Sequence, residues 1–156
     1  MLWFTSDLHI GHKNICLYAS RPFCTPAYPN GDLVAMHADI QSSWNALVAP
    51  DDEVWHLGDY AMGNVRWGLD WLANLHGVHT IVLGNHDKPW AGKKSDPTWR
   101  EEFKLAFAEV HDGPIDLSTA FTKYTGAPVS VLANHFPFAE PFPAGKVDKY
   151  AAHRHP

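Results

Sequence analysis

Residues 2–9 read Leu-Trp-Phe-Thr-Ser-Asp-Leu-His, an apolar run that ends in a carboxylate and an imidazole two positions apart. Two later apolar runs end in a similar way. Residues 53–57 lead into Gly58-Asp59, and residues 78–83 lead into Gly84-Asn85-His86-Asp87. Short apolar runs bounded by Gly or Asp are typical of buried strands. We therefore expect three strands that each end at a group of polar side chains.

Helical periodicities separate these runs. Apolar residues recur at three- and four-residue spacing over residues 33–48, beginning after Gly31-Asp32. A second stripe covers residues 65–75, with Asn64 as a suitable N-cap. A third covers residues 99–110 and opens at Asp96-Pro97, where Asp can cap the helix and Pro suits its first turn. Strands that alternate with helices indicate an α/β fold whose sheet is at least partly parallel.

The second half of the chain changes in character. Residues 115–117 and 129–133 read as strands, and the latter run enters Asn134-His135. Residues 21–31 and 136–149 each contain three prolines and read as irregular loops. With 156 residues and 46% hydrophobic content, the chain is expected to form a single domain, residues 1–156, around one core.

Composition restricts the partners and the compartment. The formal net charge is −5 and no block of like charges occurs, which argues against a membrane-binding patch and leaves nucleic acid only as a substrate. No apolar run approaches membrane-spanning length, and the apolar start is too short for a signal peptide, so we expect a cytoplasmic protein. Cys16 and Cys24 are most simply reduced thiols, although a disulfide between them stays open. The oligomeric state does not follow from the sequence.

The strand-end residues are metal ligands by type. Because side chains alternate in a strand, Asp7 and His9 should project on the same side and bind one cation, at the strand ends where open α/β sheets place their sites. Asp59 has two oxygens that could bridge two cations, while Asn85 and the later His135 suit the second. Oxygen and nitrogen ligands without thiolate favour Mn, Fe, Zn, Co or Ni.

Two cations ~3.5–4 Å apart would clamp a phosphoryl group and lower the pKa of a bound water towards ~7, so that a metal-bound hydroxide becomes the nucleophile. His86 could then protonate the leaving oxygen, and Asp87 could orient His86. His12 is close enough in sequence to the first motif to touch substrate. These residues predict a metal-dependent hydrolase of phosphate mono- or diesters that acts on a small phosphoester or a nucleotide.

Structural readings compete with these. The main constellation could be a set of polar turns, and His37, His56 and His79 read as hydrogen-bonded buried histidines. Arg21 could meet a substrate phosphate or be a solvated loop charge. Core packing is the better reading for four tryptophans, Trp3, Trp44, Trp55 and Trp99, whereas Trp90 could line a pocket. The alternative function is a catalytically weak or inactive metal- or nucleotide-binding module.

The motifs resemble the calcineurin-like metallophosphoesterase superfamily, whose pattern is D-x-H, G-D, G-N-H-D/E, a later His and a final G-H-x-H. The first four correspond to Asp7-Leu8-His9, Gly58-Asp59, Gly84-Asn85-His86-Asp87 and His135. The stretches 5–15 and 134–137 resemble its small bacterial and phage branch. The resemblance implies a layered sandwich of central β-sheets flanked by helices, and Mn as the ion for assays. It also implies one metal on Asp7, His9 and Asp59, the other on Asp59, Asn85 and His135, and His86 as the acid.

The last family motif has no clear counterpart. Ala152-His153-Arg154-His155 stands where Gly-His-x-His would be, and the preceding residues 145–150 are polar and unlike a strand. We therefore expect the domain to lack its C-terminal strands. His153 and His155 are expected to lie on an exposed loop away from the metal ligands.

Overall fold

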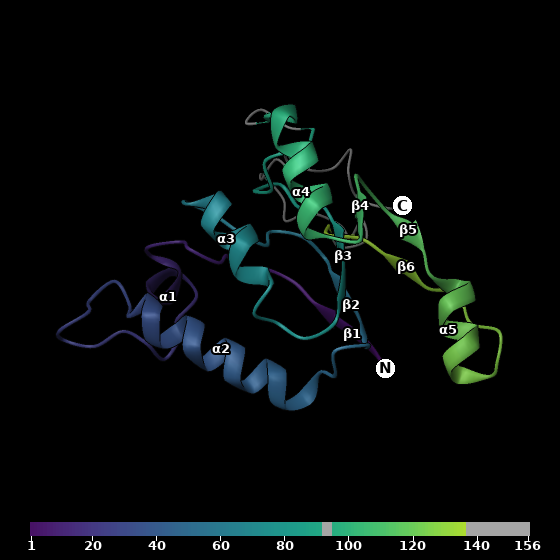
Figure 1. Ribbon diagram of the computed structural model, residues 1–156, viewed down its shortest axis with the longest axis horizontal. Helices are drawn as coiled ribbons and strands as arrows, with labels where there is room; N and C mark the ends of the chain where they lie inside the picture. The colour runs from purple at the N-terminus through teal and green to yellow at the C-terminus, as the bar shows by residue number, and fades with distance from the viewer. Residues whose placement is uncertain (92–94, 137–156) are drawn as a thin grey trace, which may run out of the picture.

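The computed structural model describes residues 1–91 and 95–136 (Figure 1). Its elements, in chain order, are β1 (Leu2–Thr5), α1 (Ile15–Tyr18), α2 (Leu33–Leu47), β2 (Glu53–His56), α3 (Val65–Leu72), β3 (Val78–Val82), the 3-10 turn η1 (Pro97–Trp99), α4 (Arg100–Ala106), β4 (Glu109–His111), β5 (Ile115–Asp116), α5 (Ser118–Thr125) and β6 (Leu132–Ala133). No helix in the described part of the chain is long and apolar enough to cross a membrane.

A four-stranded parallel sheet lies at the centre, with strand order β1-β2-β3-β4. Thr5 lies opposite His56, and His56 lies opposite Ile81, so the first three strands finish at one edge. The expected α/β fold with a parallel sheet is confirmed. Strands β5 and β6 form a separate antiparallel pair.

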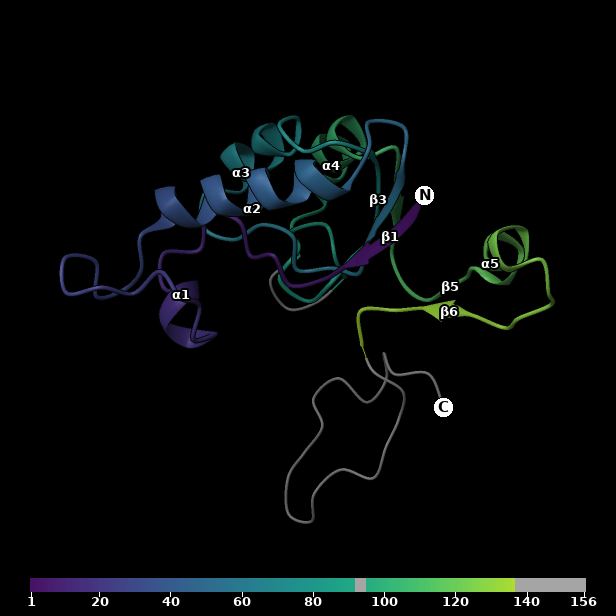
Figure 2. The same cartoon turned by 90° about the horizontal axis from the view of Figure 1, so that it is seen from below.

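Helices α2, α3 and α4 cover one face of the central sheet, as Figure 2 shows. The β5–β6 pair and α5 lie on the other side, where the ring of Phe121 stacks on Phe4 of β1 with centroids 5.5 Å apart. Burial along β2 alternates accordingly, with Val54 and His56 buried beneath the helices. The helical layer therefore protects one face of the sheet more completely than the other.

Three helix starts agree with the sequence. The side chain of Asp32 accepts a hydrogen bond from the Ala35 N–H at 3.0 Å, and Asn64 accepts one from the Trp67 N–H at 3.2 Å. Asp96 caps η1 in the same way. These side chains satisfy backbone donors that a helix leaves without partners in its first turn.

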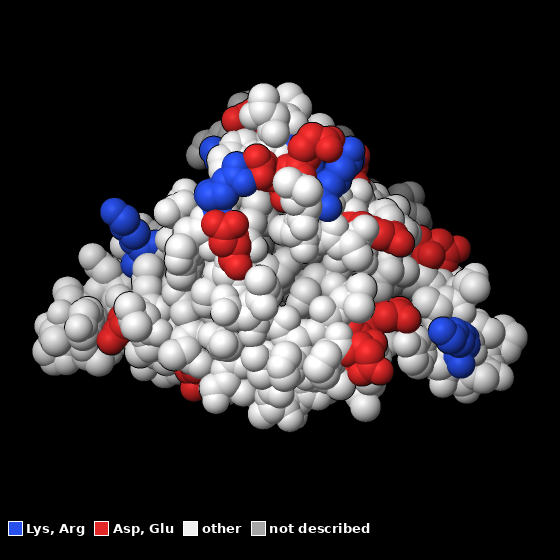
Figure 3. Space-filling view, in the orientation of Figure 1, with Lys and Arg blue, Asp and Glu red and all other residues white. Residues whose placement is uncertain are grey.

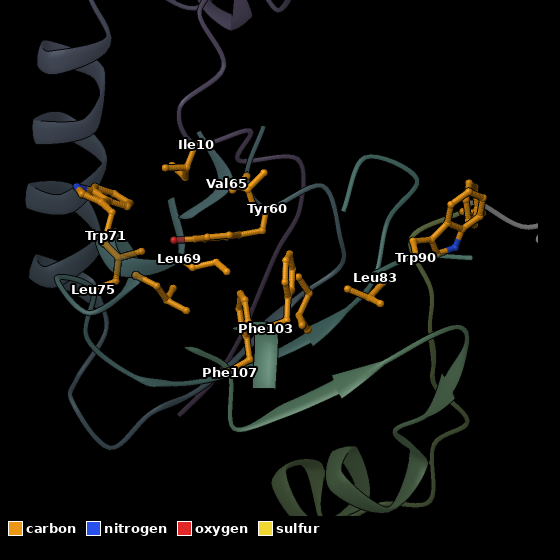
Figure 4. Packing of buried hydrophobic residues seen from close by; sticks show 14 residues of the cluster. Ile10, Tyr60, Val65, Leu69, Trp71, Leu75, Leu83, Trp90, Phe103 and Phe107 are labelled. Carbon is orange, nitrogen blue, oxygen red and sulfur yellow. The ribbon is translucent and has the colours of Figure 1, made fainter. Parts of the chain in front are cut away.

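The main core lies between the sheet and helices α3 and α4 (Figure 4). Tyr60 and Phe103 are its largest fully buried side chains, and the Tyr60 hydroxyl donates to the Gly68 carbonyl at 2.9 Å. Trp90, whose role was open, is buried here together with Trp71. The four assigned to the core, Trp3, Trp44, Trp55 and Trp99, are only partly buried.

Other sequence expectations need correction. The third apolar stripe does not stay helical, because Phe107 adopts extended backbone after α4 and Val110 lies in β4. The region between the last two expected strands contains α5, and the later strand is limited to Leu132–Ala133.

Cys16 is buried and Cys24 exposed, and both are free thiols. The loop over residues 21–31 contains no helix or strand, as expected.

Candidate metal centre

The first two motifs run side by side beyond the ends of their strands. The N–H of Asp7 donates to the Gly58 carbonyl at 3.0 Å, and the N–H of His9 donates to the Asp59 carbonyl at 3.0 Å. The bond from the Ile10 N–H to the Tyr60 carbonyl, at 2.8 Å, extends this pairing. The segment after β1 is therefore fixed against the segment after β2.

Left-handed backbone, and not strand alternation, brings the side chains of the first motif together. Strand β1 ends at Thr5, and the φ angles are +54° at Asp7 and +50° at His9. Asp59 has the same conformation, with φ +54°. Asp, Asn and His enter this region more readily than most residues with a side chain. The expected juxtaposition holds, but its geometric cause is different.

Two glycines allow the second and third motifs to touch. A Cβ atom on Gly58 would lie 2.5 Å from the amide nitrogen of Gly84. A Cβ atom on Gly84 would lie 2.3 Å from the Oδ1 atom of Asp59. Neither position has room for a side chain, so the two glycines permit the close approach that places Asp59 against the third motif.

Asp87 joins the motifs through backbone hydrogen bonds, and among the described residues its carboxylate has no hydrogen bond to the side chain of His86, which it was expected to orient. Its Oδ2 accepts from the N–H groups of Asp59 and Gly84, both at 2.8 Å, and its Oδ1 accepts from that of Tyr60 at 3.0 Å. Burial raises the pKa of Asp87 to about 7, with the Asp59 charge adding to the rise and the three donors opposing it. Loss of this carboxylate would leave three buried N–H groups unsatisfied, at about 1–3 kcal/mol each.

The first expected ligand set is assembled. Asp7, His9 and Asp59 each offer a ligand atom, and these atoms all lie within 4.8 Å of one another. The Nε2 atom of His9 is 3.6 Å from Asp7 Oδ1 and 3.8 Å from Asp59 Oδ2. These separations exceed hydrogen-bond lengths. They lie within the ~4.2 Å limit for two atoms each ~2.1 Å from one cation. This group could bind a metal ion.

Asp59 presents its two oxygens to different partners. Its Oδ2 faces His9, whereas its Oδ1 lies 3.7 Å from the Nε2 atom of His135. That Nε2 atom is also 3.2 Å from the Oδ1 atom of Asn85. The second expected set, Asp59, Asn85 and His135, is therefore assembled as well. The buried Asp59 carboxylate stands between the two sets.

Ring nitrogens at the site suit cation binding. The Nδ1–H of His135 donates to the Leu57 carbonyl at 2.8 Å, which leaves Nε2 of the neutral ring as an acceptor facing other acceptors. A cation between them would satisfy all of these atoms. Burial lowers the pKa of His9, although the charges of Asp59 and Asp7 oppose the shift. The Nδ1 atom of His9 is buried and has no hydrogen-bond partner among the described residues.

His86 lies at the open side of the cluster. Its side chain is 41% exposed, and its Nε2 atom is 4.0 Å from Asp59 Oδ2. Its backbone N–H donates to Asp59 Oδ1 at 2.8 Å, which holds the third motif against the second. Beside it, a pocket of about 310 Å³ is lined by Asn85, His86 and Trp90 among others, so Trp90 does line a pocket. A substrate could approach the cluster from this side.

Arg21 supports the first motif, which the sequence reading did not anticipate. Its guanidinium donates to the carbonyls of Asp7 and Leu8, at 2.8 and 3.0 Å. The half-buried arginine thus holds the left-handed turn in place. In the sequence, the only sign of this role is that Arg21 is the one charged residue between Lys13 and Asp32. Arg21 is therefore not a solvated loop charge, and its contact with a substrate phosphate stays a prediction.

Two other predictions concern residues that do not belong to either set of ligands. The ring of His12 is 6.0 Å from that of His9, so His12 is adjacent to the cluster. His153 and His155 lie outside the described residues, as does the segment 145–150 that precedes them.

Comparisons with known proteins give relatives whose names state no activity. No family model matches the chain. It is 34% identical over 145 residues to the Gene 66 protein of Mycobacterium phage D29, with 88% of this chain and 64% of that protein covered. The Gene 66 protein of phage L5 is 29% identical over 139 residues, covering 87% and 63%. The chain thus spans less than two thirds of the length of these phage proteins.

Two further matches come from other microbes. An uncharacterized protein of Methanocaldococcus jannaschii is 32% identical over 89 residues, which is 56% of this chain and 47% of that protein. A crystal structure of a protein of unknown function from Aquifex aeolicus superposes with a TM-score of 0.66 at 22% identity, covering 98% of this chain and 67% of that one. This similarity shows a shared fold.

Proposed function

We propose that this chain is a metal-dependent phosphoesterase of the calcineurin-like metallophosphoesterase superfamily, which hydrolyses phosphate mono- or diesters at a dinuclear centre. The placement of Asp59 carries the proposal. Its Oδ2 faces His9, which is grouped with Asp7, and its Oδ1 faces His135, so one buried carboxylate can contact two cations. A carboxylate that binds a single ion has no need to present its two oxygens to different groups of ligands.

The donor set fits two divalent cations. Asp7, His9 and Asp59 would hold one, and Asp59, Asn85 and His135 would hold the other. When bound, such cations neutralise phosphoryl oxygens and acidify water at neutral pH. At His135, acceptor atoms face one another, and at His9, carboxylates lie close to the ring. A cation would stabilise both arrangements.

His86 would supply the proton for the leaving oxygen. Its imidazole is exposed enough to meet a substrate, and its backbone bond to Asp59 fixes its position relative to the ligands. A positioned acid of this kind contributes about 10²- to 10⁴-fold to a rate. A module that only binds metal has less need of such a group, so His86 favours the enzyme.

A metal- or nucleotide-binding module with little turnover is the second candidate. Within residues 1–91 and 95–136, each proposed cation receives three protein ligands. Water would complete their coordination, and affinity would be weaker than in a site closed by further side chains. This candidate predicts metal binding without hydrolysis.

The deciding experiment is hydrolysis of bis(p-nitrophenyl) phosphate by protein freed of metal and then supplied with Mn²⁺. We expect p-nitrophenol release only with added ion, and its loss on chelation. Calorimetric titration of the same sample with Mn²⁺ separates the two candidates. Metal binding without release supports the module, whereas release that survives exhaustive chelation contradicts the dinuclear mechanism.

A further inference from the structure

A row of aromatic rings leads from the proposed metal centre to the surface. The ring of His9 meets that of His12 edge to face, with centroids 6.0 Å apart, and His12 meets Tyr18 in the same manner at 5.8 Å. Tyr18 is 70% exposed, at the end of helix α1. In Figure 2, the segment that follows β1 leads into helix α1. An exposed aromatic face thus stands two ring contacts from a proposed metal ligand.

Local structure fixes both outer rings. The N–H of Asn14 donates to the Nδ1 atom of His12 at 3.2 Å, and the Asn14 side chain donates to the Tyr18 hydroxyl at 3.4 Å. The other side of α1 is anchored, because Ile15 and Cys16 are buried in a small cluster with Met36. The aromatic face is therefore held in place by the fold and is not a free surface side chain.

The hydrogen bond to His12 also assigns its tautomer. Because Nδ1 accepts from Asn14, the proton of the neutral ring lies on Nε2. No described residue accepts from that Nε2–H group. His12 therefore offers a donor next to the place where a substrate phosphoryl group would bind.

We propose that His12 and Tyr18 form a subsite for the aromatic substituent that stays on the phosphorus during hydrolysis, an aryl group or a nucleobase, with the Tyr18 ring stacking on it and His12 Nε2–H donating to a phosphoester oxygen. The inference rests on the proposed function for the position of the phosphoryl group. Stacking on an aromatic side chain changes the affinity for a nucleobase by ~5- to 150-fold. For a ring as exposed as Tyr18, we expect the lower end of that range.

Two esters that release the same product test the subsite by turnover. Bis(p-nitrophenyl) phosphate carries a second aromatic group, and methyl p-nitrophenyl phosphate does not. Tyr18→Ala should raise KM about fivefold for the aryl ester alone and leave kcat little changed, while Tyr18→Phe should retain the wild-type KM. Tyr28→Ala is the matched control, since Tyr28 is also exposed, at 53%, in the proline-rich loop. Equal KM changes for both esters, or none, would overturn the proposal.

A binding measurement decides the subsite even without turnover. Calorimetry on the Mn²⁺-loaded protein should show adenosine monophosphate binding about fivefold more tightly than ribose 5-phosphate, and Tyr18→Ala should abolish this difference. His12→Ala should weaken both ligands alike, because it removes a donor to the phosphate. If wild-type protein hydrolyses neither ester but keeps the preference, the phosphoesterase proposal fails and the subsite stands. If the two ligands bind wild-type protein equally, the subsite is wrong.

Discussion

Two groups of histidines in this molecule differ in what their ring nitrogens meet. In the core, His56 Nε2 lies 3.0 Å from His79 Nδ1, and His79 Nε2 lies 3.3 Å from the Leu75 carbonyl. Each proton in this series of hydrogen bonds has an acceptor. The ring of Trp44 stacks over that of His56, with ring centroids 5.7 Å apart. At the strand ends, the Nε2 atoms of His9 and His135 instead face carboxylate or amide oxygens.

The difference shows that residue type alone does not mark a ligand. A buried histidine whose two nitrogens pair with a donor and an acceptor is structurally complete. A histidine whose free nitrogen faces acceptors needs a cation or a second proton. Ion pairing also differs between the molecular surface and the strand ends. Figure 3 shows acidic and basic side chains interspersed around α4 on one face, where Arg66–Glu102 and Arg100–Asp112 form ion pairs, whereas the buried Asp59 has no Lys or Arg partner among the described residues.

The largest expected effect concerns turnover. His86→Ala should slow hydrolysis by about 10²- to 10⁴-fold, because a positioned acid is lost, while metal content by elemental analysis stays at the wild-type level. His111→Ala is the matched control, since the ring of this half-buried histidine stacks on Trp55 and faces Glu109, neither of which is a proposed ligand. If His86→Ala strips the metal instead, His86 belongs among the ligands and the assignment of the acid is wrong.

Metal loading should respond more to Asp59→Asn than to His86→Ala. Only Asp59 faces both sets of ligands, so its loss should weaken both ions by more than the ~10- to 100-fold that follows loss of a residue orienting a ligand. Elemental analysis after dialysis measures this directly. Unchanged stoichiometry in Asp59→Asn would show that no ion depends on the bridging position.

Acid should lower the free energy of unfolding through the core histidines, and added metal should not restore it. Burial lowers the pKa of His56 well below its usual value, with repulsion from His79 adding to it, and burial also lowers the pKa of His79. Since the unfolded chain takes up these protons near pH 6.5 and the folded chain resists, the free energy of unfolding should fall as pH decreases below 6.5. The loss approaches about 1.4 kcal/mol per pH unit for each histidine.

Urea unfolding of chelated protein at pH 7.5 and pH 5.5 measures that loss. The double substitution His56→Phe with His79→Leu removes both titrating groups, so its free energy of unfolding should change less between the two pH values, whatever its absolute stability. An equally steep loss in the double variant would place the acid sensitivity elsewhere.

The smallest effect is expected at Arg21. Arg21→Gln removes the guanidinium bonds to the carbonyls of Asp7 and Leu8, so the first motif should bind its cation about tenfold less tightly. Arg66→Gln controls for loss of a cation, because Arg66 pairs on the surface with Glu102. Equal Mn²⁺ affinities for the two variants, by calorimetry, would mean that the turn holds its shape without Arg21.

The sequence predicted those parts of the structure that depend on local pattern. The three apolar runs before Asp7, Asp59 and Asn85 became adjacent parallel strands, because strands joined by helical crossovers finish at one edge. Asp32 and Asn64 were recognisable as caps, since their side chains act on the next turn of backbone.

Features set by tertiary context escaped prediction. Val110 continues the helical spacing of α4 but pairs with Ile81 in the sheet. Helix α5 has no buried residue and no marked apolar stripe, so its sequence resembles a loop. The pairing of Asp87 with three backbone donors depends on contact between two strand ends that are far apart in the chain. Arg21 likewise acts on carbonyls, which no side-chain motif records.

The left-handed conformations of Asp7 and His9 also bear on how this protein would respond to selection for heat resistance. For a residue with a Cβ atom, that backbone conformation costs about 1–2 kcal/mol of conformational energy, whereas for glycine it does not. Asp59 is partly compensated by its bond to the His86 N–H, but the side chains of Asp7 and His9 have no hydrogen bond to another described residue. In a library screened for thermal endurance without any demand for activity, glycine should accumulate first at positions 7 and 9. The variants that survive best would then be those that have discarded their metal ligands.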